Sequence, residues 1–229
     1  MVENPDRRTF LAALAGTSVA FLGGIGYVLA DAHEFEKIAN ELRPDGRKRL
    51  PPNQYPLERL RPMGGTEGDA SLKDYRLKVH GEVEKPFELD FAALLAMPQA
   101  ALVCDVHCVT KWSVLGARWN GVRVADLAER AQLKPTARHV IFEGAADYTS
   151  NIDLKEAMKP NVLVAHRYEG EALSRRNGAP VRALVPDRYF WKSAKWLTGI
   201  RFSAQDEPGY WETRGYDNHA DPWLEERYG

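Results

Sequence analysis

The chain has 229 residues, of which 44% are hydrophobic and 28% charged, and 31 Lys and Arg against 32 Asp and Glu give it a formal net charge of −1. A neutral chain has no surplus of basic residues with which to release counterions from a nucleic acid, so the composition argues against a nucleic-acid partner. Two cysteines, Cys104 and Cys108, are too few for a disulfide-stapled scaffold or a four-thiolate zinc or iron–sulfur site. Their spacing leaves a local disulfide open.

The N-terminus carries a paired arginine, Arg7-Arg8, followed by an uncharged segment from Phe10 to Ala30. This is the form of a twin-arginine signal, which exports proteins already folded around a cofactor, and Ala30-Asp31-Ala32 offers a small-x-small cleavage site. The uncharged run is also near the ~20 residues that cross a bilayer, so a plain membrane anchor is the alternative. We therefore expect residues 1–32 to be a twin-arginine signal, cleaved or retained as an anchor, and the protein to be periplasmic.

A short charged helix or linker is expected over residues 33–50, ended by Pro51 and Pro52, and a single domain over residues 51–229. Apolar alternation and β-branched runs predict strands over residues 75–81, 102–109, 139–144, 162–166, 181–185 and 196–202. Amphipathic spacing predicts short helices over residues 92–97, 124–131 and 154–158, with a turn at Trp119-Asn120-Gly121 before the second. Strands and helices interleave without a βαβ rhythm, so the predicted class is α+β with mixed sheets.

Several motifs stand in one order along this domain. They are His107-Cys108-Val-Thr-Lys-Trp-Ser113, the strand over residues 139–144, the run from Tyr168 to Pro186, and Trp191-Lys-Ser-Ala-Lys-Trp196. With them, the chain from about Leu50 to Gly229 resembles the molybdopterin-binding domain of the sulfite oxidase superfamily. It is most similar to the single-domain bacterial members, which share their fold with the catalytic subunit of the periplasmic methionine sulfoxide reductase. The resemblance implies a molybdenum–molybdopterin cofactor and two-electron oxo transfer.

Cys108 is the expected protein ligand of the metal. A soft thiolate suits molybdenum, and the resemblance places the ligand immediately before Val-Thr-Lys-Trp-Ser. One cysteine suffices because, as the resemblance implies, the dithiolene supplies the other sulfurs. Cys104 is expected to be a small buried hydrophobic residue.

The pterin carries a phosphate and a heterocycle edged with donors and acceptors, so its pocket needs cations and amides at fixed positions. Arg182 offers a permanent charge, Asn177 an amide, and Ser193 and Lys195 a hydroxyl and an ammonium. The resemblance matches these four residues to positions that hold the cofactor. The alternative for Lys195, and for Lys192 near it, is a solvated strand residue.

Substrate pockets of sulfite oxidases use arginines and a tyrosine, because an anion must be charge-matched when it is desolvated. Candidates here for catalysis and substrate binding are Lys111, Tyr148 and Tyr189, with Arg118 and Asp147 as further pocket residues, although surface charge and core aromatics are the alternative for each. Lys111 stands where sulfite oxidases continue Gly-Asn-Arg. This difference favours reduction of an S- or N-oxide over the alternative, oxidation of sulfite or a related small anion.

The C-terminal run from Pro208 to Tyr228 is dense in aromatic residues and is expected to wrap the domain. A haem domain and the dimerisation domain of sulfite oxidases are not expected. Electrons would then be exchanged with a separate protein, either a membrane haem protein or a soluble cytochrome. The alternative from another class is a non-catalytic binding or assembly module with the same fold and an empty pocket.

Overall fold

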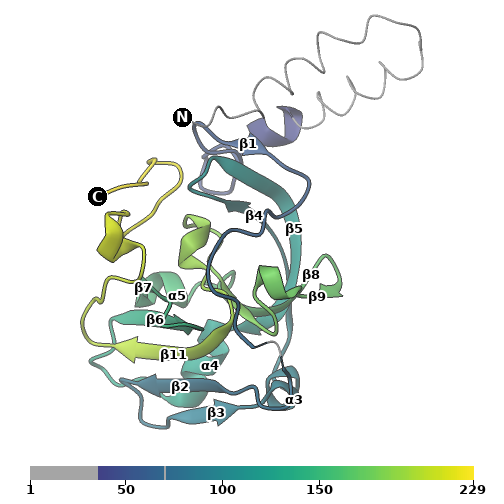
Figure 1. Ribbon diagram of the computed structural model, residues 1–229. Coiled ribbons are helices and arrows are strands. Elements are labelled where there is room, and N and C mark those ends of the chain that lie inside the picture. Colours follow the sequence, from purple (N-terminus) through teal and green to yellow (C-terminus); the bar gives the residue numbers. More distant parts are fainter. Residues whose placement is uncertain (1–35, 70) are drawn as a thin grey trace, which may run out of the picture. The chain divides into compact units, whose positions relative to one another are not determined.

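The computed structural model describes residues 36–69 and 71–229 (Figure 1). The arginine pair and the uncharged segment that predict an export signal lie outside this part of the chain. Within it, no helix is both long enough and apolar enough to span a membrane. Residues 39–229 form one unit.

Two mixed sheets make up this unit. In the first, the order is β1 (Tyr55–Pro56), β5 (Trp112–Arg123), β8 (Leu163–Tyr168) and β10 (Arg182–Leu184), with β4 (Ala100–His107) paired to β5 and β9 (Glu171–Ala172) paired to β8. In the second, the order is β3 (Phe87–Leu89), β2 (Leu77–Gly81), β11 (Leu197–Ser203), β6 (His139–Gly144) and β7 (Thr149–Asp153). Pairs β1–β5 and β2–β11 are parallel and the other pairs are antiparallel, which confirms the predicted mixed-sheet domain.

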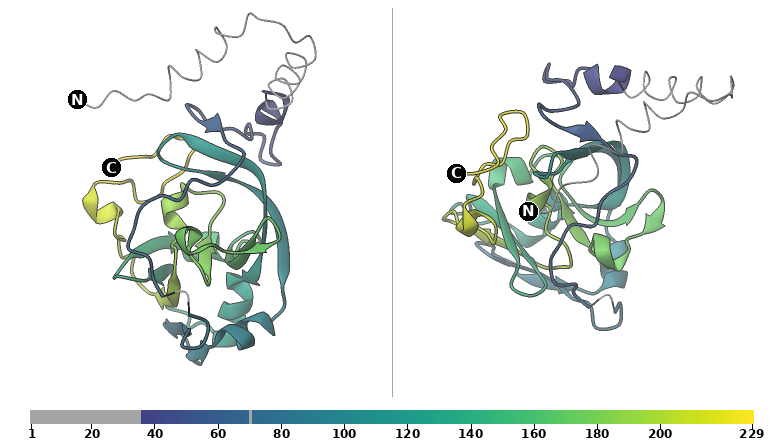
Figure 2. Two further views of the ribbon diagram at one scale, coloured as in Figure 1. Left: turned by 45° about the vertical axis from the view of Figure 1, so that its right-hand side comes forward. Right: turned by 45° about the horizontal axis from the view of Figure 1, so that its top comes forward.

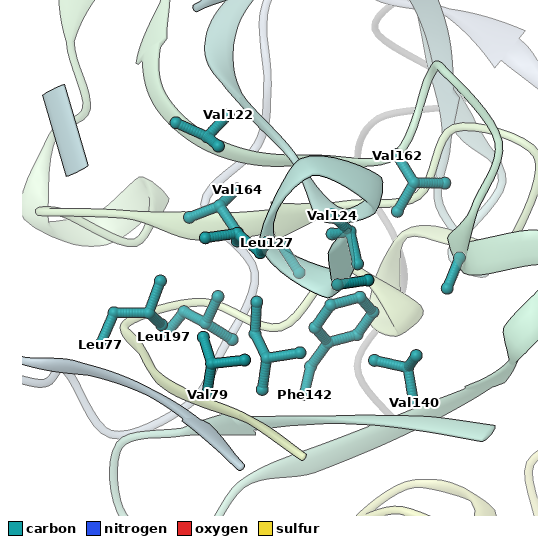
Figure 3. Close-up of a cluster of buried hydrophobic side chains, with 14 of the residues drawn as sticks. Leu77, Val79, Val122, Val124, Leu127, Val140, Phe142, Val162, Val164 and Leu197 are labelled. Atoms are coloured by element: carbon teal, nitrogen blue, oxygen red, sulfur yellow. The ribbon is translucent and has the colours of Figure 1, made fainter. Parts of the chain in front are cut away.

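Short helices connect the strands. They are α3 (Phe91–Leu95), α4 (Val124–Ala131) and α5 (Leu154–Ala157), with the 3₁₀ turns η1 (Arg175–Asn177), η2 (Phe190–Lys192) and η3 (Glu212–Arg214). The buried residues of α4 recur at the i, i+3, i+4 and i+7 spacing of one helix face. That face packs into the largest core cluster, beside Phe142 of β6 and Val164 of β8 (Figure 3).

This core draws apolar side chains from both sheets. Those labelled in Figure 3 come from β2, β5, α4, β6, β8, β11 and the residue before β8. A second cluster lies around Trp112, Trp119 and Cys108 on the first sheet. The site residues therefore sit on strands and turns that two packed clusters hold in place.

One expectation from the sequence is wrong. The predicted turn at Trp119-Asn120-Gly121 is part of β5, the longest strand described, which continues directly to α4. Gly121 is needed for strand packing rather than for a turn, since a Cβ there would lie 2.3 Å from the carbonyl oxygen of Val164 on β8.

Candidate functional site

The hairpin that joins β4 and β5 carries Cys108 in its turn. His107 pairs with Ser113 across the ladder. The amide of Lys111 donates to the carbonyl of Cys108 at 3.0 Å, and the amide of Cys108 donates to Trp112 at 2.8 Å. Lys111 has a φ of 72°, which closes the chain tightly. The pairing of the strands therefore fixes Cys108 at the tip of the sheet.

Both thiols are free, which makes the alternative of a local disulfide wrong. Cys104 lies four residues earlier, within β4. An extended strand separates such positions by roughly 13 Å, beyond the reach of a disulfide. Cys108 thus remains available as a single thiol ligand.

The Cys108 thiol is buried, with the residue only 6% exposed. Its Sγ atom lies 3.2 Å from the Thr110 hydroxyl oxygen. Burial raises the pKa of the thiol, while the Thr110 contact and the positive charge of Arg227 act in the opposite direction. Without a further cation the thiol is therefore protonated, and a metal ion is the kind of cation that would hold it as thiolate.

A series of hydrogen bonds between uncharged groups holds the Cys108 turn in place. Gln54 donates from Nε2 to the carbonyl of Cys108 at 3.1 Å and accepts from the Ser113 hydroxyl at 3.2 Å. Ser113 also lies 2.8 Å from Nδ1 of His107. Burial lowers the pKa of His107 to about 3, so this imidazole is neutral and adds no positive charge beside the Cys108 thiol. Sequence reasoning missed Gln54, which follows two prolines and has no periodic signal.

Arg182, the first residue of β10, is a buried cation without a carboxylate partner among the described residues. Its guanidinium donates to the carbonyls of Ser193 at 2.8 Å, Asn177 at 3.1 Å and Ala183 at 3.3 Å. Burial lowers its pKa. A desolvated charge held by carbonyl dipoles and aromatic rings, without a carboxylate, favours the binding of an anion.

Lys195 adds a second cation next to Arg182. Its Nζ donates to the carbonyls of Met63, Gly64 and Arg176, and burial together with the charge of Arg182 lowers its pKa to about 8. Lys195 lies outside the strands and is only part-exposed, so the alternative of a solvated strand residue is wrong. Gly178, at φ +105°, places the end of η1 against both cations. A Cβ at this position would lie 3.0 Å from Cβ of Lys195 and 3.2 Å from Cβ of Arg182.

The two remaining predicted cofactor residues flank this pair. The Ser193 hydroxyl accepts from the amide of Val185 at 2.9 Å, so Ser193 orients the Arg182 neighbourhood through its backbone carbonyl and its side chain. The backbone carbonyl of Asn177 accepts from Arg182, and the side-chain amide of Asn177 makes no hydrogen bond with any residue that the structure describes. That amide is therefore available to a ligand.

Phe190 links the Arg182 region to the Cys108 turn. Its ring centroid lies 4.1 Å from the Arg182 guanidinium, 6.2 Å from the Trp112 ring and 6.3 Å from the Trp119 ring. Near it, the indole N–H groups of Trp112 and Trp119 and the Tyr168 hydroxyl are buried without partners in the described chain. The region thus offers cations and unpaired donors, which fits a ligand rich in phosphate and ring acceptor atoms.

The other predicted pocket residues are spread over the surface and the core. Lys111 and Asp147 are exposed, and Arg118 is paired with Glu169 at 2.7 Å with 70% of its side chain exposed. The Tyr148 hydroxyl donates to the carbonyl of Trp191 at 2.6 Å, on the Arg182 side. Tyr189 is fully buried, and its backbone forms an isolated parallel β-bridge with His107, next to the Cys108 turn. Of these residues, only Lys111 and Tyr189 are placed at the turn.

Arg227 also reaches this turn, and sequence reasoning missed it. From the C-terminal segment, drawn in yellow in Figures 1 and 2, it donates from Nη1 to the carbonyl of Val109, the residue after Cys108. The aromatic density of this segment predicts that it wraps the domain. No pattern in it identifies which side chain points inward.

Two open surface hollows lie elsewhere. One is lined by Met97, Pro98, Arg123, Asp126, Glu129 and Arg130, and the other by residues around Tyr75 and Trp196. Neither includes Cys108 or Arg182. We assign the site to the buried groups, because the unpaired donors and the lone thiol are there and the hollows have neither.

Known proteins match this chain over most of its length. Residues 64–211 match the model of the oxidoreductase molybdopterin binding domain. The chain is 38% identical over 189 residues to the uncharacterized oxidoreductase YuiH of Bacillus subtilis. This alignment covers 80% of this chain and 94% of YuiH. It is 34% identical over 155 residues to the protein-methionine-sulfoxide reductase catalytic subunit MsrP of Burkholderia mallei, which covers 61% of this chain and 46% of MsrP. The match thus spans less than half of MsrP.

Among solved structures, the sulfane dehydrogenase SoxCD from Paracoccus pantotrophus is similar, with a TM-score of 0.56 and 24% sequence identity. The similarity covers 61% of this chain and 40% of the SoxCD chain. At this identity the comparison supports the fold alone.

Proposed function

The chain belongs to the oxidoreductase molybdopterin binding domain family, and we propose that it uses a molybdenum cofactor for two-electron oxo transfer, with an S- or N-oxide as the substrate that is reduced. One observation carries the proposal: a buried thiol, Cys108, and a buried guanidinium without a carboxylate partner in the described chain, Arg182, are both near Phe190. The Phe190 ring packs against the cluster that contains Cys108, and its centroid lies 4.1 Å from the Arg182 guanidinium. The thiol offers a soft metal ligand and the guanidinium a counter-charge for a phosphate.

The residues present fit this cofactor. Cys108 would bind the metal, and Arg182 and Lys195 would hold the phosphate. The free amide of Asn177 and the unpaired indole N–H of Trp119 would face the pterin. When bound, the cofactor supplies a metal whose oxidation state changes by two, and an oxygen atom that can be transferred to or from the substrate.

The chain's own residues keep the ligand in place and exclude water. Hydrogen bonds from Gln54 and Lys111 to the Cys108 carbonyl fix the turn, so the thiol keeps one orientation. Burial raises the pKa of the thiol, and Thr110 and Arg227 offset part of this increase in favour of the thiolate that a metal needs. Burial of the surrounding side chains strengthens these electrostatic interactions, because little water screens them.

Two observations support reduction. The protein-methionine-sulfoxide reductase catalytic subunit is a relative by name, and Lys111 stands where sulfite oxidases continue Gly-Asn-Arg. A relative named as a catalytic subunit also supports a separate electron-transfer protein as partner, in the form of a membrane haem protein or a soluble cytochrome. Export to the periplasm by the twin-arginine route is supported by the pattern at residues 7–30 alone.

Steady-state assays separate the candidate reactions. Protein matured in a host that makes the cofactor should oxidise a reduced dye when methionine sulfoxide or an N-oxide is added. Turnover only with sulfite and an oxidised dye would reverse the direction we propose. A stable, monodisperse protein without pterin or molybdenum would instead favour the non-catalytic module.

A further inference from the structure

Two buried donors next to the Cys108 turn have no acceptor. Nη2 of Arg227 and the hydroxyl of Tyr189 are each shielded from solvent, and neither has a hydrogen-bond partner in the part of the chain that the structure describes. Such groups are rare in folded proteins, because a buried donor without a partner has lost its hydrogen bonds to water and gained none in exchange, which destabilises the folded state. The two residues are neighbours, with the Arg227 guanidinium 4.9 Å from the centroid of the Tyr189 ring, and together they indicate a place for an acceptor that the described chain does not supply.

The Arg227 side chain is fixed in this position. Its guanidinium lies 4.9 Å from the ring centroid of Tyr189, and its Nη1 donates to the carbonyl of Val109. The nearest carboxylate oxygen, on Glu225, is 3.8 Å from Nη2, which is too long for a hydrogen bond. The positive charge is therefore only partly offset.

Tyr189 is equally constrained. Its ring stacks on Trp191 with centroids 5.2 Å apart, and its amide donates to the carbonyl of Ala220 at 2.8 Å. Burial raises the pKa of Tyr189 to about 12, although Arg227 and Gln54 act in the opposite direction, so the hydroxyl keeps its proton at neutral pH. The Gln54 oxygen already accepts from Ser113, and the Tyr189 hydroxyl has no acceptor among the described residues. Its proton is therefore available to a ligand.

We propose that Nη2 of Arg227 and the hydroxyl of Tyr189 bind the oxygen of the substrate, that is, an oxygen bonded to sulfur or nitrogen, beside the Cys108 metal ligand. The inference rests on the proposed function and names its oxygen-binding residues. Such an oxygen carries a strong negative partial charge and two acceptor lone pairs, which match one guanidinium N–H and one phenolic O–H. The phosphate and ring acceptors of the cofactor are met separately, by Arg182 and the donors around Phe190.

Tyr189→Phe is the sharpest variant, because it removes one unpaired hydroxyl and keeps the stacked ring. We expect thermal stability and molybdenum content to stay at the wild-type level. Calorimetric titration of the oxidised holoenzyme, which has no electrons to transfer, should show the Kd for methionine sulfoxide rising about tenfold, the loss expected for one good hydrogen bond. Arg227→Lys keeps the positive charge but replaces the planar guanidinium, with its fixed N–H groups, by a compact ammonium. It should raise the Kd for methionine sulfoxide at least as much as Tyr189→Phe does.

Tyr148→Phe is the matched control. Its hydroxyl already donates to the carbonyl of Trp191, so the variant should lower stability and leave the Kd unchanged. Unchanged Kd values in Tyr189→Phe and Arg227→Lys, at wild-type molybdenum content and with sulfoxide turnover intact, would overturn the inference and leave the proposed function standing.

A second titration with sulfate separates the two sources of such an oxygen. If the wild type binds sulfate and not methionine sulfoxide, and both variants lose the sulfate affinity, the oxygen site stands as a site for oxyanions. The proposed reduction of a neutral oxide then fails.

Discussion

At the scale of single residues, the site depends on two buried groups whose charge is unfavourable without a ligand. The order of motifs in the sequence predicts Cys108 and Arg182 as site residues, and the structure shows both of them buried. The motifs do not identify Gln54, Phe190 or Arg227, since each of them makes its contact with a segment far away in the chain. Lys111 stood next to the ligand in sequence, yet its side chain is exposed.

The thiol of Cys108 can be tested by exchange for a hydroxyl. Cys108→Ser should give a folded protein in which turnover falls about 100-fold or more, because a serine hydroxyl is a harder donor that stays protonated. Cys104→Ser is the matched control and should keep most activity, since Cys104 lies in β4 away from the turn. Steady-state assays and circular dichroism check both variants, and equal losses would contradict the choice of ligand.

The guanidinium of Arg182 should control cofactor retention. Arg182→Ala should lower molybdenum and pterin content severalfold, because a buried phosphate would lose its closest permanent counter-charge. Lys111→Ala should leave the content unchanged, since that side chain is exposed. Elemental analysis of the two purified variants is the measurement, and normal molybdenum in Arg182→Ala would argue against the assignment.

At the scale of elements, periodicity predicted most of the domain. Helix α4 and strand β6 begin and end where the sequence places them, because an amphipathic face and a β-branched run are strong local signals. Strand β5 was not predicted over its length, since Gly116, Asn120 and Gly121 give it the composition of a turn. Pairing with β4, β8 and β1 overrides those local preferences, and pairing cannot be read from one segment.

Gly121 provides the test at this scale. Gly121→Ala should lower the free energy of unfolding by about 1–3 kcal/mol, because its Cβ would lie 2.3 Å from a backbone oxygen that cannot move without disturbing β8. Gly64→Ala is the control, since no atom lies within 4 Å of a Cβ there. Urea denaturation followed by circular dichroism measures both, and equal midpoints would show that β5 and β8 can separate at low cost.

At the scale of the whole domain, the two ends of the unit formed by residues 39–229 contact each other near the Cys108 turn. Arg43 and Arg47 lie 4.3 and 4.2 Å from the ring of Trp223, and Arg49 pairs with Asp105 of β4 at 2.6 Å. The Trp223 ring in turn contacts His107, with centroids 5.0 Å apart. A segment that the sequence suggests as a linker thus contacts the C-terminal segment and the strand that leads to Cys108.

Export is a property of the whole protein, and the arginine pair can be tested directly. Arg7-Arg8→Lys-Lys should trap the protein in the cytoplasm, because a receptor that reads two guanidinium groups fails on ammonium groups of another shape. A plain membrane anchor would be indifferent, since either pair satisfies the preference for positive residues on the cytoplasmic side. Cell fractionation of the two forms is the measurement, and equal distribution would support the anchor.

The central claim, that this chain holds a molybdenum cofactor through Cys108, is tested most directly by the metal and pterin content of the full-length protein purified from a host that makes the cofactor. We expect molybdenum and pterin in equal amounts near one per chain in the wild type and in Cys104→Ser, and no stably bound molybdenum in Cys108→Ser. A folded wild-type protein with neither molybdenum nor pterin, or with the same molybdenum content as Cys108→Ser, would contradict the account.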